Sequence, residues 1–312
     1  GALIFNGYTG DVELWKSDGT SEGTAVLKNI SQNYDSYPGS MTGFVLFNNE
    51  VYFDVANTAS NTPPEACELW KTNGTPEGTV AVKPGTTLEP GEELGVCGSF
   101  LYFPVMVWVT DHYVYELWKS DGTPDGTVKL PGLSFTSSSP GRFTVYNGSL
   151  YFSANDGTHG WEIWKLNCAT DAAAMVKDIS PDSNSDSQTE LTVYNGLLYF
   201  RASHPDYGDE LWQTDGTEAG TTLVKDINPG SAGSSLYELT AFNGMLYFSA
   251  DDGEHGDELW QSDGTGAGTT LVKDIYPGLE GSDPYEFTAV NGALFFTATD
   301  GTAGYELWKL QP

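Results

Sequence analysis

Closely spaced carboxylates are the first feature of this sequence that could do chemistry. Short glycine-rich segments contain Asp156, the pair Asp251 and Asp252, and Asp300. Such carboxylates suit Ca²⁺, a hard cation that takes about six to eight oxygen ligands. No segment has the spacing of an EF-hand loop, and the alternative is a turn in which each aspartate accepts a backbone N–H. The four aspartates are therefore candidate calcium ligands, with local turns as the competing interpretation.

Aromatic residues gather in a second place, residues 104–115, which read PVMVWVTDHYVY. We expect two long strands that turn near residues 110–111 and carry Trp108 and Tyr113 beyond the edge of their neighbours. Clustered exposed aromatic side chains are typical of binding hot spots. The alternative is that this hairpin folds over a neighbouring repeat and buries them. The candidate residues for binding a carbohydrate or protein partner are Trp108, His112, Tyr113, His159 and Trp161.

The sequence offers less to an enzyme or to a polyanion partner. It contains no P-loop, HExxH or CxxC pattern, so common phosphate-binding and metallohydrolase chemistry lacks a motif. The net charge of −30, from 43 acidic and 13 basic residues, places acids near one another throughout. A carbohydrate-active enzyme with paired carboxylates therefore remains an alternative. The same charge argues against nucleic acid and anionic membranes as partners, because phosphate binding needs basic patches.

A repeat positions all of these residues. The string Glu-Leu-Trp or a close variant occurs seven times, at spacings of 55, 48, 46, 48, 48 and 48 residues. A period of this length is typical of propeller blades, and it leaves no room for an unrelated second domain. We therefore expect residues 1–312 to form one domain. The repeated tryptophans are Trp15, Trp70, Trp118, Trp164, Trp212, Trp260 and Trp308.

Each repeat predicts four short strands, A to D. Strands A and B flank an Asn-Gly dipeptide, as at Asn243, which favours a tight hairpin turn. Strands C and D flank an Asp-Gly-Thr turn, and a long polar connector leads to the next repeat. Two hairpins in series make a four-stranded antiparallel meander, and meanders at this period indicate a β-propeller.

The count of strands sets the predicted architecture. The chain begins with strands B, C and D of one blade and ends with strands A, B and C of another. We predict an all-β, seven-bladed propeller with three-stranded first and last blades; an open, curved array is the alternative. The predicted blades are residues 1–30, 41–85, 90–132, 140–179, 188–227, 236–275 and 285–310.

The consensus E-L-W-x-x-D-G-T-x-x-G-T-x-L-V-K-D-I, best seen in residues 210–227 and 258–275, resembles the ELWxxDGT repeat family of bacterial secreted and surface proteins. The resemblance covers essentially the whole chain. It implies an exported repeat protein, and it supplies no catalytic residues. Three copies depart from the pattern: Asn73 replaces the aspartate, the third copy shortens strand D to residues 127–131, and the fourth reads Asn-Cys-Ala at residues 167–169.

Residues present in every repeat are expected to serve the fold. The tryptophan of strand C predicts packing between blades, since one large residue recurs at one place in each blade. The glutamate two positions earlier lies on the same face of its strand. We expect it to pair, across strands or across blades, with the lysine of strand D, as in Lys177, Lys225 and Lys273.

These observations favour an extracellular or cell-surface protein that binds a ligand or partner, with an adhesive or matrix-building role. A structural subunit of a surface layer or filament, self-associating through its incomplete end blades, is one alternative. The carbohydrate-active enzyme is the other. No apolar run is long enough for a transmembrane helix. Three cysteines leave at least one unpaired within the chain, and the sequence leaves the pairing open.

Overall fold

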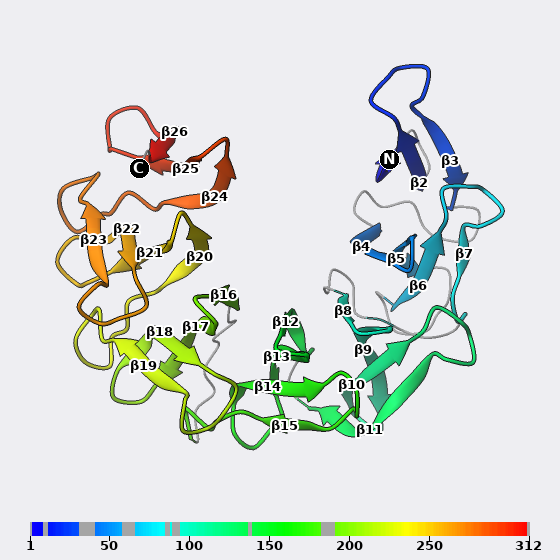
Figure 1. The fold of residues 1–312 in the computed structure, drawn as a ribbon, viewed down its shortest axis with the longest axis horizontal. Coiled ribbons are helices and arrows are strands. Elements are labelled where there is room, and N and C mark those ends of the chain that lie inside the picture. Colours follow the sequence, from blue (N-terminus) through cyan, green and yellow to red (C-terminus); the bar gives the residue numbers. More distant parts are fainter. Residues whose placement is uncertain are drawn as a thin grey trace. The chain divides into compact units, whose positions relative to one another are not determined.

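The computed structural model describes residues 2–8, 12–30, 41–57, 66–84, 88, 94–136, 139–181 and 191–310. These residues form strands and turns, arranged as seven antiparallel sheets of three, four, four, four, four, four and three strands (Figure 1). This confirms the predicted β-propeller with three-stranded end blades. None of the described residues lies in a helix that could cross a membrane.

The chain divides into two compact units, and the boundary runs through blade four. The first unit comprises Gly1–Leu150, Ala154–Gly157 and Leu166–Ala173, and the second comprises Tyr151–Ser153, Thr158–Lys165 and Ala174–Pro312.

Blades one to three belong to the first unit, and in each of them the strands pair in chain order. Their strands are β1 (Leu3–Tyr8), β2 (Val12–Ser17) and β3 (Ala25–Asn29); β4 (Met41–Phe47), β5 (Glu50–Asn57), β6 (Ala66–Thr72) and β7 (Val80–Ala81); and β8 (Gly95–Cys97), β9 (Phe100–Val109), β10 (His112–Ser120) and β11 (Val128–Phe135).

Blade four is shared, and blades five to seven belong to the second unit. Their strands are β12 (Gly141–Tyr146), β13 (Ser149–Asn155), β14 (Trp161–Asn167) and β15 (Ala173–Met175); β16 (Thr192–Tyr194), β17 (Leu197–His204), β18 (Gly208–Thr214) and β19 (Thr222–Lys225); β20 (Tyr237–Phe242), β21 (Met245–Asp251), β22 (Asp257–Ser262) and β23 (Thr270–Lys273); and β24 (Tyr285–Val290), β25 (Ala293–Thr299) and β26 (Tyr305–Leu310).

Local sequence explains the hairpins. The asparagines of the Asn-Gly turns have φ between 46° and 51°, in the left-handed region that a type I′ turn requires. They are Asn147, Asn195, Asn243 and Asn291. One local prediction is wrong: strand D of blade three is not shortened, because β11 continues to Phe135. Residues 130–133 bulge opposite Leu117, and beyond the bulge the strand pairs again, up to Tyr115 with Phe135.

The core lies between successive blades. One face of blade five presents the tyrosine of strand B and the leucine of strand C, and blade six meets it with its own strand-B residues and its tryptophan. Alternation along the strands sends these two sets to opposite faces of one sheet. Between blades five and six the buried residues include Tyr199, Leu211, Ile227, Leu246, Phe248, Ala250 and Trp260.

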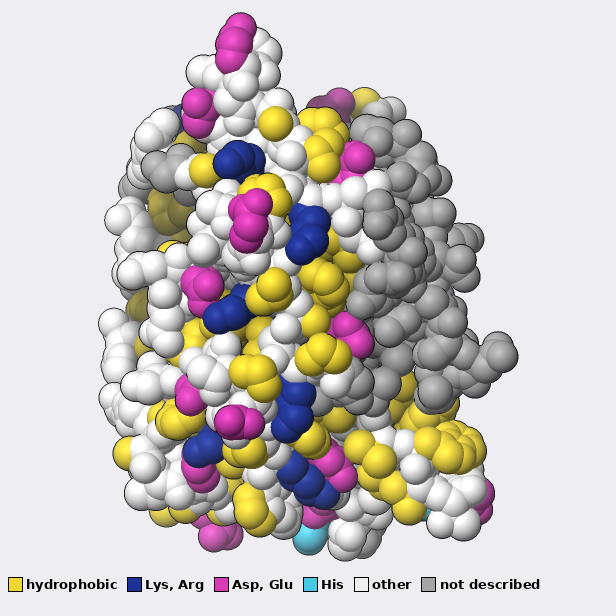
Figure 2. All heavy atoms as spheres, turned by 90° about the vertical axis from the view of Figure 1, so that its right-hand side faces the viewer, with side chains coloured by type: hydrophobic (Ala, Val, Ile, Leu, Met, Phe, Trp, Pro, Cys, Tyr) yellow, Lys and Arg dark blue, Asp and Glu magenta, His cyan; other side chains and the backbone are white. Residues whose placement is uncertain are grey.

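A repeated lysine contact joins neighbouring blades. Lys225, at the end of strand D in blade five, donates from Nζ to the carbonyl of Thr269 in blade six at 2.9 Å, and Nζ lies 6.0 Å from the ring centroid of Trp260. We call this arrangement the inter-blade lysine contact. Figure 2 shows the result on one side of the molecule, where basic side chains alternate with hydrophobic ones. Equivalent rings lie beneath Lys28, Lys83, Lys177 and Lys273.

The glutamate of strand C has a different role from the one predicted. Glu258 is fully buried, and its carboxylate accepts the backbone N–H groups of Ile275 and Tyr276 and the hydroxyl of Ser282. It therefore binds the connector that leaves its own blade. The predicted glutamate–lysine pair is wrong here and at Glu210, and it exists in blade three, where Lys129 Nζ lies 2.6 Å from Glu116 Oε1.

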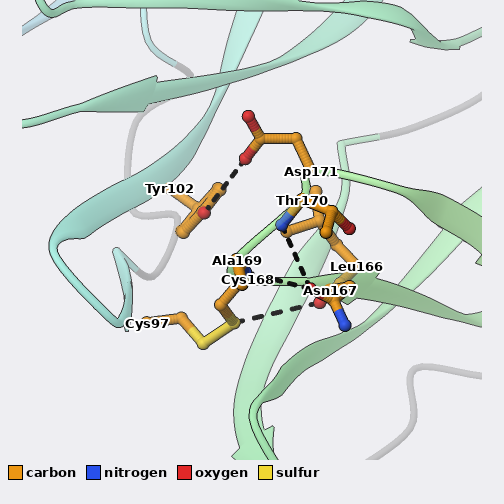
Figure 3. Close-up of a disulfide and its surroundings, with 8 residues drawn as sticks. All are labelled: Cys97, Tyr102, Leu166, Asn167, Cys168, Ala169, Thr170 and Asp171. Atoms are coloured by element: carbon orange, nitrogen blue, oxygen red, sulfur yellow. Dashed lines mark hydrogen bonds between the residues drawn. A yellow bond between two sulfur atoms is a disulfide. The ribbon is translucent and has the colours of Figure 1, made fainter.

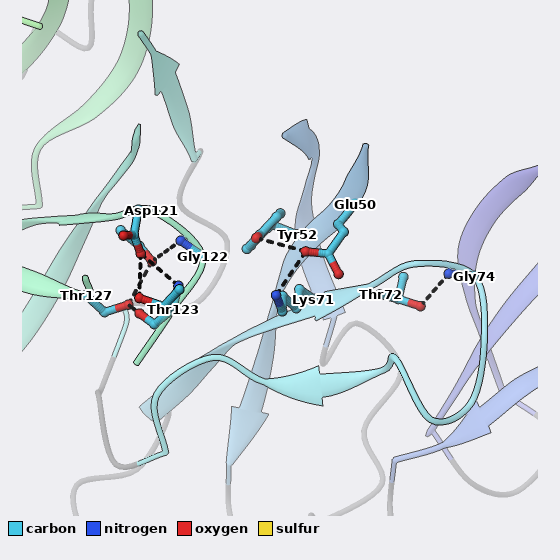
Figure 4. A network of polar contacts seen from close by, with 10 residues as sticks. Glu50, Tyr52, Lys71, Thr72, Gly74, Asp121, Gly122, Thr123 and Thr127 are labelled. Carbon is cyan, nitrogen blue, oxygen red and sulfur yellow. Dashed lines mark hydrogen bonds and ion pairs between the residues drawn. The ribbon is translucent and has the colours of Figure 1, made fainter. Parts of the chain in front are cut away.

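A tyrosine from one blade also supports the Asp-Gly-Thr turn of the next. In Figure 4, Tyr52 and its partners Glu50 and Lys71 face the turn at Asp121 and Gly122. A Cβ atom at Gly122 would stand 2.2 Å from the Tyr52 hydroxyl oxygen. The turn has room for glycine alone, and the same contact recurs for Tyr151 with Gly216 and Tyr199 with Gly264.

Candidate interaction site

The blade-three hairpin extends past its neighbouring strands. Strand β8 pairs with β9 as far as Tyr102, and β11 pairs with β10 as far as Tyr115. The pairing of β9 with β10 continues to Val109 and His112. The end of the hairpin is therefore a two-stranded ribbon, as the sequence predicted. We call residues 107–114 the hairpin tip.

Two aromatic side chains face each other across this ribbon. Trp108 and Tyr113 are directly paired, with ring centroids 4.5 Å apart at an interplanar angle of 69°. An edge-to-face pair stabilises a ribbon that has no third strand. Trp108 is nevertheless 55% exposed, so the alternative in which the hairpin buries it within its own chain is wrong.

The charged groups of the tip lie at its turn. Thr110 has a φ of 56°, and the next two side chains, Asp111 and His112, form an ion pair when the imidazole is protonated, with 2.9 Å between Oδ1 and Nδ1. These two side chains are 83% and 54% exposed, respectively. The tip thus combines an aromatic surface with an exposed carboxylate.

The other predicted binding residues lie in the second unit. His159 lies two residues before β14, and Trp161 is the first residue of this strand; both are half-buried. Blade two also has a long segment between its second and third strands, and residues 58–65 of that segment lie outside the described residues. The site that the structure describes is therefore the hairpin tip.

The aspartates predicted to bind calcium form local turns. Asp252 Oδ1 accepts the N–H groups of Glu254 and His255 at 3.0 Å each. Burial acts to raise its pKa, but these hydrogen bonds outweigh it and the pKa is lowered. Asp300 accepts the hydroxyl and N–H of Thr302, which lowers its pKa.

The other two predicted calcium ligands are also in turns. Asp251 accepts the N–H of Gly253, as Asn155 accepts that of Gly157 in blade four, and Asp156, the residue after Asn155, is half-buried. Within the described ranges, no three acidic, histidine or cysteine side chains form a group suited to a metal ion. Calcium binding therefore stays a prediction.

Two carboxyls with strongly raised pKa values lie elsewhere. Burial raises the pKa of Glu162 to about 8 and that of Glu210 to about 7, although backbone N–H groups bound to each carboxylate act in the opposite direction. A raised pKa is typical of catalytic acids. These glutamates are 4% and 0% exposed and occupy one position of the repeat, so their environment serves the connectors.

One sequence match to a hydrolase motif also lies in a turn. Residues 19–23 read Gly-Thr-Ser-Glu-Gly, which has the spacing of a hydrolase nucleophile elbow. That motif needs a turn from a strand into a helix, whereas these residues join strands β2 and β3. The Ser21 hydroxyl lies 3.1 Å from the Glu22 carboxylate, and both side chains are exposed.

Disulfide and ion-pair contacts join blade three to blade four (Figure 3). Cys97, at the end of β8, is bonded to Cys168, which follows β14. The Tyr102 hydroxyl donates to Asp171 at 3.4 Å, and Lys119 forms an ion pair with the same carboxylate. Burial, followed by the charge of Asp171, raises the pKa of Tyr102 to about 12, so this hydroxyl stays protonated.

Comparison with known proteins supports the fold. No protein-family model matches the chain, and no curated protein matches it in sequence. Solved structures that resemble it include one from a study of two prolyl endopeptidases (TM-score 0.57, 10% identity), a puromycin hydrolase mutant (0.54, 12%) and prolyl oligopeptidase B from Galerina marginata (0.57, 10%).

These matches cover nearly all of this chain and only about half of each structural neighbour. Each match covers 99% of this chain but only 48%, 50% and 47%, respectively, of the other. The chain therefore spans about half the length of these structural neighbours. At such identity the likeness establishes the propeller fold and carries no activity.

Proposed function

We propose that this chain is a non-enzymatic, extracellular binding propeller with an adhesive or matrix-building role, and that the hairpin tip is its recognition element. The observation that carries the proposal is the exposure of Trp108 on a ribbon that projects past the other two strands of blade three. An exposed tryptophan costs solvation free energy that a partner recovers by covering it. Aromatic residues of this kind dominate the energetics of protein interfaces.

The disulfide supports the proposed location. Structural disulfides persist in oxidising environments and are rare in the cytosol. Cys97 is 3% exposed and Cys168 is half-buried, so the blade junction partly shields the bond. A bond of this kind suits a protein that folds and works outside the cell.

The experiment that tests the proposal is a binding survey with matched variants. Glycan and protein arrays are probed with the wild-type chain, with Trp108→Ala, and with Tyr207→Ala as the control. Tyr207 is also an exposed loop aromatic, but it lies between β17 and β18 and stacks on His204. We expect specific signals that Trp108→Ala loses and Tyr207→Ala keeps. Signals equal for all three proteins would contradict the role of the tip.

The same survey addresses calcium. Reading the arrays and the thermal unfolding curve with Ca²⁺ and with EDTA tests ligands at Asp156, Asp251, Asp252 and Asp300. A ligand that binds the native state alone raises its melting temperature. Identical curves would remove any calcium site that matters to stability.

A second candidate is a propeller that accompanies a catalytic domain. It is favoured by one observation, that the chain matches about half of each peptidase chain. Assaying this chain with proline-containing peptides tests whether it has activity of its own. Hydrolysis that Ser21→Ala abolishes would overturn the non-enzymatic proposal.

A structural subunit would instead polymerise, which light scattering after size-exclusion chromatography detects.

A further inference from the structure

The chemistry of the hairpin tip favours one kind of partner. Within residues 105–115 the sequence has one acidic residue, Asp111, and one histidine, and it has no lysine or arginine. At the tip itself, the exposed carboxylate of Asp111 follows Trp108 by three positions. An electron-rich aromatic face near a carboxylate attracts a cation, through the quadrupole of the ring and through the charge of the acid.

The rest of the molecule already uses this chemistry. Five tryptophans of the repeat have a lysine Nζ between 5.3 and 6.0 Å from a ring centroid. All 13 lysines and arginines lie within the described ranges, and among these none is placed over Trp108. A cation that covers this ring therefore comes from outside the chain.

The net charge also selects for a basic partner. At −30, the chain repels anionic molecules and raises the local concentration of cationic ones near its surface. Screening at physiological ionic strength limits this attraction to about 8 Å, so a diffuse field gives little specificity. A specific contact needs a defined group such as the tip.

Resting on the function proposed above, we propose that the hairpin tip docks a basic segment of a partner polypeptide, with a lysine or arginine side chain over Trp108 and Asp111 as its counter-ion. Tyr113 then acts as a support, because its edge-to-face contact fixes the orientation of the Trp108 ring. The partner is a protein with an exposed Lys- or Arg-rich segment, and neutral sugars are the competing occupants.

The test uses defined peptides. A fluorescent peptide that alternates lysine and glycine is titrated with the chain at physiological ionic strength, beside a control peptide with glutamine in place of lysine. We expect the lysine peptide to bind more tightly. Trp108→Leu, which keeps apolar area but removes the ring, should weaken its binding about tenfold, and Asp111→Asn about threefold. Tyr207→Ala should bind as the wild type does.

Several outcomes would overturn the proposal. Binding of the lysine peptide that Trp108→Leu and Asp111→Asn leave unchanged would show diffuse attraction by the acidic surface. Trp108-dependent binding of neutral glycans without binding of the lysine peptide would overturn the basic partner and leave the proposed function standing. Asp111→Asn preserves the shape of the turn, so it keeps the test decisive even where Trp108→Leu disturbs the hairpin.

Discussion

The junction between blades three and four differs from the junction between blades five and six. Between blades five and six, Lys225 contacts Thr269 and Trp260, and Tyr199 fills the space beneath Gly264. Between blades three and four, the Asp-Gly-Thr turn is replaced by residues around Cys168, and Lys129 binds Glu116 of its own blade.

Other groups join blades three and four. The tyrosine of strand B keeps its place as Tyr102 but donates to Asp171, and Lys119 pairs with the same carboxylate. The disulfide adds a covalent link. One packing scheme can therefore keep its tyrosine and exchange its turn, provided that other contacts replace those that the turn supplied.

The largest effect is expected from removing the disulfide. Replacing Cys97 and Cys168 by serine should cost about 2–4 kcal/mol of unfolding free energy, since the bond closes a long loop. Denaturant unfolding of the oxidised protein and the variant measures the loss. Hydrogen exchange should rise first at residues 94–102 and 166–173. Equal exchange at the junction of blades five and six would show that the two junctions do not differ in this way.

A glycine substitution tests the junction between blades five and six. Gly264→Ala puts a Cβ atom 2.3 Å from the Tyr199 hydroxyl, whereas Gly74→Ala meets no atom within 4 Å. Their φ values are 92° and 86°, so the strain of a left-handed alanine is common to both. We expect Gly264→Ala to cost about 1–3 kcal/mol more than Gly74→Ala. Adding Tyr199→Phe should recover part of the difference; no recovery would assign the cost to the backbone.

The two strand-D lysines should differ in weight. Lys225→Met keeps the length of the side chain but loses both the hydrogen bond to Thr269 and the cation over Trp260, at a cost of about 1–2 kcal/mol. Lys129→Met breaks a pair in which the lysine side chain is 41% exposed, and should cost about 0.5 kcal/mol. Thermal unfolding of both variants at one pH compares them. Equal losses would contradict the inter-blade role of Lys225.

The last expected effect depends on pH. Since burial raises the pKa of Glu210 to about 7, the folded state retains a proton that the unfolded chain loses above about 4.5. The stability that this proton provides is complete below that pH and is lost as pH rises towards 7.

The neutral variant Glu210→Gln avoids this loss. It should unfold at a higher temperature than the wild type at pH 8.5 and not at pH 5. Glu116→Gln, which breaks the pair with Lys129, should show no such gain. A gain in unfolding temperature for Glu210→Gln that is the same at both values of pH would contradict the raised pKa of Glu210.

Local chemistry made most of the fold predictable. The Asn-Gly turns, the four strands of each repeat and the extended hairpin follow from residue types a few positions apart, and the structure confirms each. The sequence left open whether Trp108 is exposed or buried, because burial depends on what lies beside the hairpin in space.

Contacts between repeats were less predictable. The role of Glu258 escaped prediction because its partners are backbone N–H groups, which every residue carries. The bond of Cys97 to Cys168 escaped it because three cysteines allow several pairings. The prediction that strand D of blade three is shortened was wrong. Pro131 and Gly132 are typical of the end of a strand, whereas here they lie in a bulge beyond which β11 continues.

The tyrosine–glycine contact has a consequence for how these repeats are inherited. Tyr52 and Gly122, like Tyr199 and Gly264, belong to successive repeats, so a mutation in one copy is tolerated or rejected according to the copy beside it. Blade one has Ile4 at the tyrosine position, and Gly74 after it is unobstructed. A duplicated or transplanted blade therefore has to match two neighbours at once. Aligned relatives of this chain should show these distant positions changing together, whereas position 74 is restricted by its positive φ alone.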